Sequence, residues 1–203
     1  MRADLLEPPP EDDDKLLKRD LICLTDAQAA LKTATFGEIL VPFGFWNLTT
    51  QSALDAYKAR LSRYPLDQQP RLVATIYGTP REASLGMLQQ MRAFLKGSFA
   101  FMDLRVEDAT FPIHGLPPEL IDSVTLLLTG ETEFDRMSTI QRFAERKNAY
   151  DGKGVIQGVA GVATRAELEA CRAGGIARVQ GPAITTLLDK PLAAADGAPI
   201  ALS

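Results

Sequence analysis

Residues 155–181 read VIQGVAGVATRAELEACRAGGIARVQG and contain a complete strand–helix–strand pattern. An apolar run at 154–159 is followed by a helical period over 165–173. Gly174 and Gly175 then stand where a helix ends, just before a second apolar run at 177–181. Both runs are continuous instead of alternating, which is typical of strands buried on both faces. The stretch therefore predicts a βαβ unit with two parallel strands.

The same rhythm extends over most of the chain. Further apolar runs lie at 38–43, 71–77, 98–104 and 123–128, and helical periods lie at 53–61, 82–95 and 134–149. Strands that alternate with helices predict an α/β fold with a parallel sheet, either an open doubly wound sheet or a (β/α) barrel. With about six βα units, the chain is two units short of a complete eight-stranded barrel.

The N-terminal region has a different pattern. Three consecutive prolines at 8–10 exclude a helix interior, whereas 15–33 carries apolar residues at spacings near three and four. We therefore divide the chain into an N-terminal lead-in and helical region, 1–34, and a (β/α) domain, 35–203. An incomplete barrel has open strand edges, which are prone to aggregation. We expect residues 1–34, or a partner chain, to cover them.

Composition narrows the classes of function. The net charge of −4 gives no reason to expect nucleic acid as a partner. No apolar run reaches membrane-spanning length, and the N-terminus lacks a signal-peptide pattern. Cys23 and Cys171 are isolated and His114 is the only histidine, so no zinc site and no cofactor are expected, and the thiols are expected to be buried. These features predict a cytoplasmic protein.

The common catalytic motifs are missing. The chain has no P-loop, no dinucleotide-binding glycine pattern after a strand and no G-x-S-x-G sequence. Trp46 lies close to Phe43 and Phe45 at a strand end. This aromatic cluster indicates core or interface packing, or else a platform on which a nucleobase could stack.

The stretch at 155–181 resembles the last two strands of EAL domains, the cyclic di-GMP phosphodiesterase family. The family pattern there is roughly V-[IV]-A-E-G-V-E-T, a helix with leucines, a glycine and V-Q-G. The sequence G-V-A-T at 161–164 takes the place of G-V-E-T, and V-Q-G at 179–181 matches without a gap.

Four further landmarks agree with the family in order and rough spacing. V-P-F-G at 41–44 resembles V-N-L-S, and 72–76 resembles the strand L-x-L-E-[IL]-T-E. Residues 98–103 resemble the strand that ends in D-D-F-G, and 116–124 resemble the stretch before K-I-D. The resemblance covers about residues 36–185. It implies a TIM-like (β/α) barrel of the EAL type that is partial or truncated at its N-terminus.

The resemblance also implies a site in which acids at the strand ends hold two divalent cations. This chain departs from that pattern at most positions. Pro42 replaces the asparagine, Thr75 and Gly78 replace the glutamates of the second landmark, and Met102 replaces the first of the paired aspartates; Thr125 and Leu127 replace the lysine and aspartate of K-I-D, and Ala160 and Ala163 replace the last glutamates. Asp103 and Gln180 keep the family residue. One carboxylate cannot assemble a two-metal site, so we expect no metal, no catalytic residue and no enzyme activity.

The sequence therefore predicts a non-catalytic EAL-like module that acts through a protein partner or through self-association in bacterial signalling. The alternative is a receptor for cyclic di-GMP or another nucleotide, with Gln180, Asp103 and Trp46 lining the pocket. A phosphodiesterase with a rewired site is a second alternative.

Overall fold

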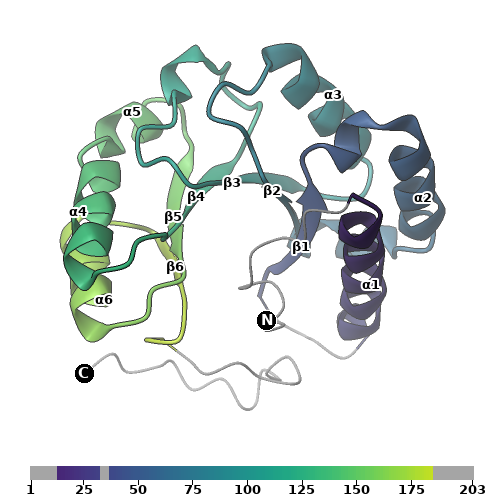
Figure 1. Cartoon of the computed structure of the whole chain (residues 1–203). Coiled ribbons are helices and arrows are strands. Elements are labelled where there is room, and N and C mark those ends of the chain that lie inside the picture. Colours follow the sequence, from purple (N-terminus) through teal and green to yellow (C-terminus); the bar gives the residue numbers. More distant parts are fainter. Residues whose placement is uncertain (1–12, 33–36, 185–203) are drawn as a thin grey trace.

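The computed structural model describes residues 13–32 and 37–184. Six strands form one parallel sheet in chain order: β1 (Ile39–Gly44), β2 (Leu72–Tyr77), β3 (Phe101–Val106), β4 (Ser123–Leu127), β5 (Ile156–Ala160) and β6 (Arg178–Gln180). Figure 1 shows this sheet curled into part of a barrel, with the helices on its outer side. The predicted (β/α) barrel of about six units is confirmed, and the open doubly wound sheet is not formed.

The helices occupy the predicted intervals with small shifts. They are α1 (Asp13–Leu31), α2 (Gln51–Leu61), α3 (Leu85–Leu95), α4 (Glu133–Ala144), α5 (Lys147–Asp151) and α6 (Arg165–Ala173), with short 3-10 turns η2 (Asn47–Thr49), η3 (Leu66–Arg71) and η4 (Ile113–Gly115). The predicted helix at 134–149 is thus divided into α4 and α5. None of the described helices is long and apolar enough to cross a bilayer.

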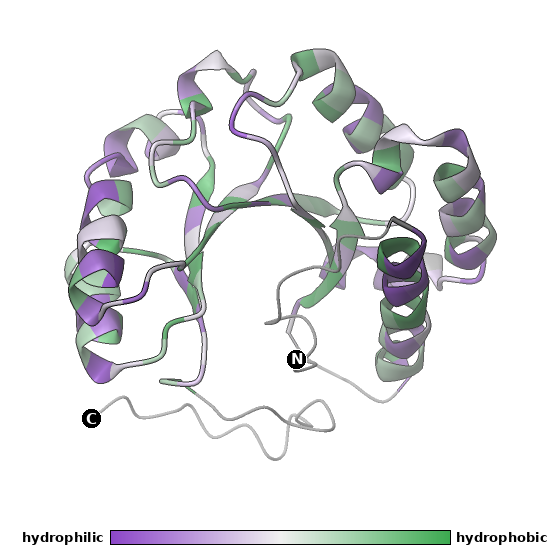
Figure 2. Ribbon diagram, in the orientation of Figure 1, coloured by the Kyte–Doolittle hydropathy of each residue, from purple (hydrophilic) through white to green (hydrophobic). Residues whose placement is uncertain are grey.

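The core lies between the convex face of the sheet and the helices. Phe43, Ile76, Leu104 and Val124 are direct neighbours in register on β1 to β4, and all four are fully buried in this layer. The next residue along each strand points to the concave face, because side chains alternate along a strand. Figure 2 shows hydrophobic residues concentrated along the strands, whereas the helices are hydrophobic on one side and hydrophilic on the other.

The segment between β3 and β4, residues 107–122, contains η4 but no α-helix. Phe111, Ile113, Leu116 and Leu120 are buried there, so apolar loop side chains cover the sheet where other units use a helix. Cys23 and Cys171 are both buried, as predicted.

The two outer strands of the sheet, β1 and β6, do not pair with each other in the described chain. A side-chain contact nevertheless joins them. Arg178 of β6 donates a hydrogen bond of 2.9 Å to Glu38, the residue just before β1. This ion pair connects the two ends of the curled sheet.

The helix α1 packs against β1 and α2, so it forms part of the barrel wall. The predicted boundary between residues 34 and 35 falls in 33–36, outside the described residues. Asp20 anchors this helix: it is fully buried and accepts hydrogen bonds from Gly44 N (2.9 Å), Tyr57 Oη (2.5 Å) and Tyr77 Oη (2.8 Å). Asn47 Nδ2 adds a longer contact of 3.4 Å. The carboxylate therefore fixes α1 to the C-terminal ends of β1 and β2.

The buried position of Asp20 predicts a pH-dependent stability. Burial raises its pKa above the ordinary value of 3.8, although the hydrogen bonds from Tyr57, Gly44, Tyr77 and Asn47 oppose the shift. The folded state therefore retains the proton to higher pH than the unfolded state, and the wild type loses stability as pH rises above about 4. The Asn side chain of the Asp20→Asn variant cannot ionise. The free energy of unfolding of this variant, measured with denaturant, should therefore increase relative to that of the wild type as the pH rises from about 4 to about 7.

The matched control is Asp55→Asn, at an exposed position of α2. This variant reports how the removal of an exposed carboxylate changes the pH profile. A pH dependence of Asp20→Asn no larger than that of Asp55→Asn would contradict the prediction.

Candidate functional site

Polar side chains line the concave face of the sheet. In strand register, Pro42, Thr75, Asp103 and Ser123 form one row across β1 to β4. The row nearer the C-terminal strand ends holds Arg105, Thr125, Gly158 and Arg178, and the last row holds Leu127, Ala160 and Gln180. Active sites of (β/α) barrels lie at the C-terminal strand ends, so this face is the candidate site.

Asp103 is the only acidic residue in the six described strands. Its side chain is 1% exposed, and Oδ1 accepts hydrogen bonds from Ser123 Oγ (2.6 Å) and Thr125 Oγ1 (2.8 Å). The other oxygen, Oδ2, has no hydrogen-bond partner within the described residues. The carboxylate is thus held by its own neighbours on β4.

Arg105 stands two residues further along β3, on the same face as Asp103. Burial lowers the pKa of this guanidinium, and the negative charge of Asp103 opposes that shift. The two side chains therefore partly neutralise each other. Sequence reasoning did not assign Arg105 and Ser123 to the site, although Ser123 lies within the landmark at 116–124. The apolar pattern of β3, interrupted by two charges at spacing two, was the available signal.

Not all of the other predicted positions lie on the concave face. Met102 is fully buried on the helix-facing side of β3, so its side chain does not contribute to the concave surface. Gly78 and Ala163 lie in the loops after β2 and β5, where Gly78 adopts a positive φ of 66°. Strand alternation turns Asp103 inward and Met102 outward, so only Asp103 of these two neighbours contributes to the concave face.

The three predicted ligand-lining residues are not brought into one cluster. Asp103 and Gln180 share the concave face, but β4 and β5 separate them. Trp46 lies beyond the end of β1 and is 58% exposed, with its ring edge-on to Phe45 at 5.1 Å. Phe43 and Phe45 are buried, so the aromatic cluster is part core and part surface.

An ion pair at the C-terminal strand ends was also missed. Arg136 of α4 donates to Glu167 Oε1 (2.5 Å) and Oε2 (3.0 Å), and to the carbonyl oxygens of Leu128 (3.2 Å) and Gly161 (2.7 Å). Burial favours a raised pKa for Glu167, but the bonds from Arg136 and from the backbone of Ala163 hold the pKa below its ordinary value. Glu167 also completes a capping box with the side chain that begins α6, a pattern visible in T-x-x-E at 164–167. This pair fastens the loops after β4 and β5.

The concave face does not fit a divalent cation. Hard cations need several oxygen ligands. Asp103 supplies one carboxylate with one oxygen occupied, and Arg105 places a positive charge beside it. Over residues 13–32 and 37–184, no three His, Cys, Asp or Glu side chains gather closely enough to hold a metal ion. We therefore derive no metal-dependent step for this chain.

The mutual dependence of Asp103 and Arg105 can be measured. Asp103→Asn keeps the shape and one acceptor oxygen but removes the negative charge near Arg105, so urea unfolding should show a loss of about 1–3 kcal/mol, the cost of leaving buried polar groups poorly paired. Arg105→Met in the same chain should recover part of that loss, which gives a coupling energy of about 1–3 kcal/mol in a double-mutant cycle. Additive effects would show that the two charges do not interact.

Comparison with solved structures identifies the fold. The EAL domain of Xanthomonas citri FimX, in complex with c-diGMP, matches with a TM-score of 0.60 and 15% identity over 87% of this chain and 72% of that chain. Bacillus subtilis YkuI, with an EAL domain in complex with c-di-GMP and calcium, matches with a TM-score of 0.59 and 13% identity over 93% of this chain and 48% of that chain.

A standalone EAL protein from Vibrio cholerae O395, in its c-di-GMP-bound form, matches with a TM-score of 0.56 and 14% identity over 86% of this chain and 75% of that chain. No family model matches the sequence, and no curated protein matches it. At sequence identities of 13–15%, the similarity to these structures extends to the fold alone. The chain therefore has the fold of EAL domains, in the form of a curled half-barrel of six parallel strands.

Proposed function

We propose that this chain is a non-catalytic EAL-like domain that acts as a regulatory or protein-interaction module in bacterial cytoplasmic signalling. The environment of Asp103 carries the proposal. The only acid of the six described strands is engaged by Ser123 and Thr125 and faces the charge of Arg105. Its other oxygen cannot by itself replace a set of metal ligands.

The remaining concave positions support the loss of catalysis. Pro42, Leu127 and Ala160 offer no side-chain ligand, and Thr75 offers one hydroxyl. Phosphodiester hydrolysis by two metal ions requires oxygen ligands that place both cations and activate water. No residue of this face is therefore proposed as catalytic.

Exposed apolar side chains support a protein partner. Trp46 after β1, Leu85 at the start of α3 and Phe134 at the start of α4 are 58%, 40% and 80% exposed. Each follows the C-terminal end of a strand, so all three belong to the same end of the barrel. Large aromatic and aliphatic side chains exposed at one end of a domain are typical of interaction surfaces. The rim of the former catalytic end is the proposed contact region.

A nucleotide receptor is the second candidate. Thr75 Oγ1, Asp103 Oδ2 and Gln180 Oε1 are buried atoms without hydrogen-bond partners in the described chain, and all three belong to concave-face residues. Buried polar groups usually find a partner, so these atoms could accept or donate to a bound ligand. The FimX, YkuI and Vibrio cholerae structures contain c-di-GMP, which makes cyclic di-GMP the ligand to test.

The loss of catalysis predicts no hydrolysis of cyclic di-GMP. Purified chain incubated with the dinucleotide and either Mg²⁺ or Mn²⁺ should yield no linear product above a heat-inactivated control, as measured by chromatography. The variant Thr75→Glu restores one acid and should also yield no linear product. Its new carboxylate and that of Asp103 do not complete the ligand shell of two metal ions. Product that depends on the metal ion in the wild type would overturn the proposal.

The receptor candidate predicts a nucleotide-dependent rise in melting temperature. If cyclic di-GMP binds the concave face, Gln180→Ala should weaken binding by about 1–2 kcal/mol in calorimetry, the cost of one lost buried hydrogen bond. The control is Gln89→Ala on the exposed side of α3, which should bind as the wild type does. Absence of any thermal shift in the wild type eliminates the receptor and leaves the interaction module.

A further inference from the structure

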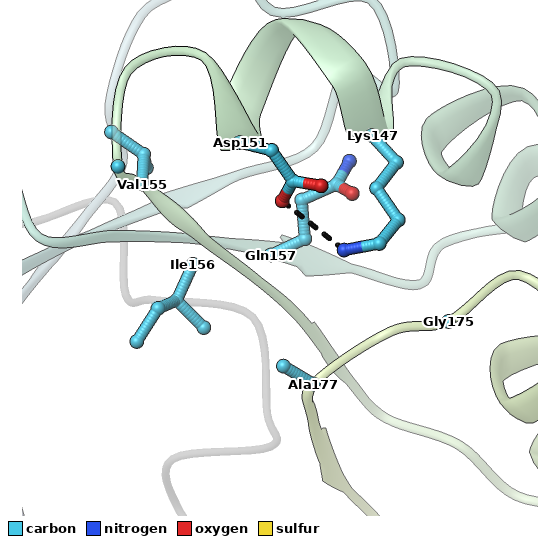
Figure 3. Close-up of a pocket in the computed structure, with 8 residues that line it drawn as sticks. Lys147, Asp151, Val155, Ile156, Gln157, Gly175 and Ala177 are labelled. Carbon is cyan, nitrogen blue, oxygen red and sulfur yellow. Dashed lines mark hydrogen bonds and ion pairs between the residues drawn. The ribbon is translucent and has the colours of Figure 1, made fainter.

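A second polar region lies at the N-terminal ends of β5 and β6, where a pocket of about 220 Å³ opens. Figure 3 shows its lining residues, which come from α5, the start of β5 and the turn before β6. Gln157 Oε1 is unpaired there but enclosed, and Gln157 Nε2 donates a hydrogen bond of 2.8 Å to Phe143 O. Lys147 and Asp151 pair with each other over 3.1 Å. These groups are thus either paired with each other or out of reach of a ligand, whereas the concave face holds an accessible charge.

That charge is the guanidinium of Arg105, which has no hydrogen bond and no ion pair with any described residue. Other partly buried arginines of the described chain are paired, Arg92 with Asp122 and Arg136 with Glu167. Buried polar groups nearly always have a partner, and a guanidinium carries five N–H donors. Arg105 therefore needs an acceptor that the described residues do not supply.

A ligand can reach part of this guanidinium. The side chain of Arg105 is partly exposed, although its Nε is enclosed. Nε is the nitrogen of Arg105 that is both enclosed and unpaired, so the unpaired terminal nitrogens Nη1 and Nη2 are accessible. Two N–H groups side by side on a planar guanidinium match the two oxygens of a planar carboxylate.

The nearby carboxylate of Asp103 is held by other donors. Its Oδ1 accepts hydrogen bonds from Ser123 and Thr125, and its Oδ2 is enclosed. A Cβ at Gly158 would lie 2.8 Å from Thr125 Oγ1, so the glycine leaves room for this hydroxyl beside Asp103. The charge of Asp103 acts on Arg105 from a distance without forming an ion pair. The terminal nitrogens of Arg105 are therefore left for another acceptor.

We propose that Arg105 binds a small monocarboxylate on the concave face, with Nη1 and Nη2 each donating to one carboxylate oxygen. A single negative charge on the ligand balances the one positive charge that lacks a direct partner. A phosphate dianion would bring a second negative charge toward Asp103, which would repel it. This binding requires neither a metal ion nor cyclic di-GMP, so it is independent of both functions proposed above.

The probe is sodium acetate, titrated into ¹⁵N-labelled protein against sodium chloride at constant ionic strength and followed by NMR. The enclosed Nε–H of Arg105 should exchange slowly with water and give a resolved signal. This signal should shift in a saturable manner between about 1 and 100 mM acetate. A shift that does not saturate, or that chloride alone reproduces, would show that water solvates Arg105 and would overturn the proposal.

Two further anions test the class of ligand. Inorganic phosphate at about pH 8, where the dianion predominates, should bind more weakly than acetate because of its second charge. Dimethyl phosphate, a tetrahedral monoanion, should also bind more weakly, because its two ester groups must fit beside a partly enclosed guanidinium. Tighter binding of either phosphate compound would identify a phosphate site and would contradict the assignment to a carboxylate.

Two variants test the residue. Arg105→Lys keeps the charge but loses the paired terminal nitrogens, so acetate should bind about tenfold more weakly. Arg105→Met should abolish binding, and if this variant fails to fold, Arg105→Lys decides the question. Both are followed at the backbone amide of Thr125, the register partner of Arg105.

The matched control is Arg165→Gln, which removes an exposed arginine at the start of α6, at the same end of the barrel. This variant should bind acetate as the wild type does. Unchanged acetate affinity in both Arg105 variants would place the anion elsewhere, and the proposal would be wrong.

Discussion

The parallel register of the sheet is the constraint on which the rest of the structure depends. Because side chains alternate along each strand, the pairing of Thr75 with Asp103 and of Asp103 with Ser123 fixes which residues meet on the concave face. The same register sends Phe43, Ile76 and Leu104 into the layer under the helices. A slip of one residue would exchange the two sets. The composition of the candidate site and that of the core are therefore consequences of one pairing.

Much of the fold could be predicted from the sequence because its signals are local. Continuous apolar runs marked the strands to within a few residues, and Gly174–Gly175 marked the end of α6. The candidate site was less predictable, since it depends on which way a side chain points. The sequence shows Met102 and Asp103 as neighbours, but only the register separates a core residue from a site residue. Contacts between distant residues, such as Asp20 with Tyr77, leave no local pattern.

The two ends of the barrel carry different chemistry. At the C-terminal strand ends lie a single engaged carboxylate and exposed aromatic side chains. At the N-terminal ends of β5 and β6, a small pocket combines an ion pair with an unsatisfied amide oxygen. The pair of Arg136 with Glu167 and the cluster around Asp20 keep the loops and α1 in place at the C-terminal strand ends.

The ion pair between Glu38 and Arg178 bears on the mechanics of the sheet. In a closed barrel every strand has two hydrogen-bonded neighbours, and strand number and stagger together fix the radius. Here the two outer strands are connected by side chains whose charges are partly exposed to water. The radius of curvature is therefore not fixed by hydrogen bonds between strands. It depends on strand twist and on the Glu38–Arg178 ion pair, which salt can screen. A molecule that bridged both edges would therefore fix the diameter of the barrel as well as cover its opening.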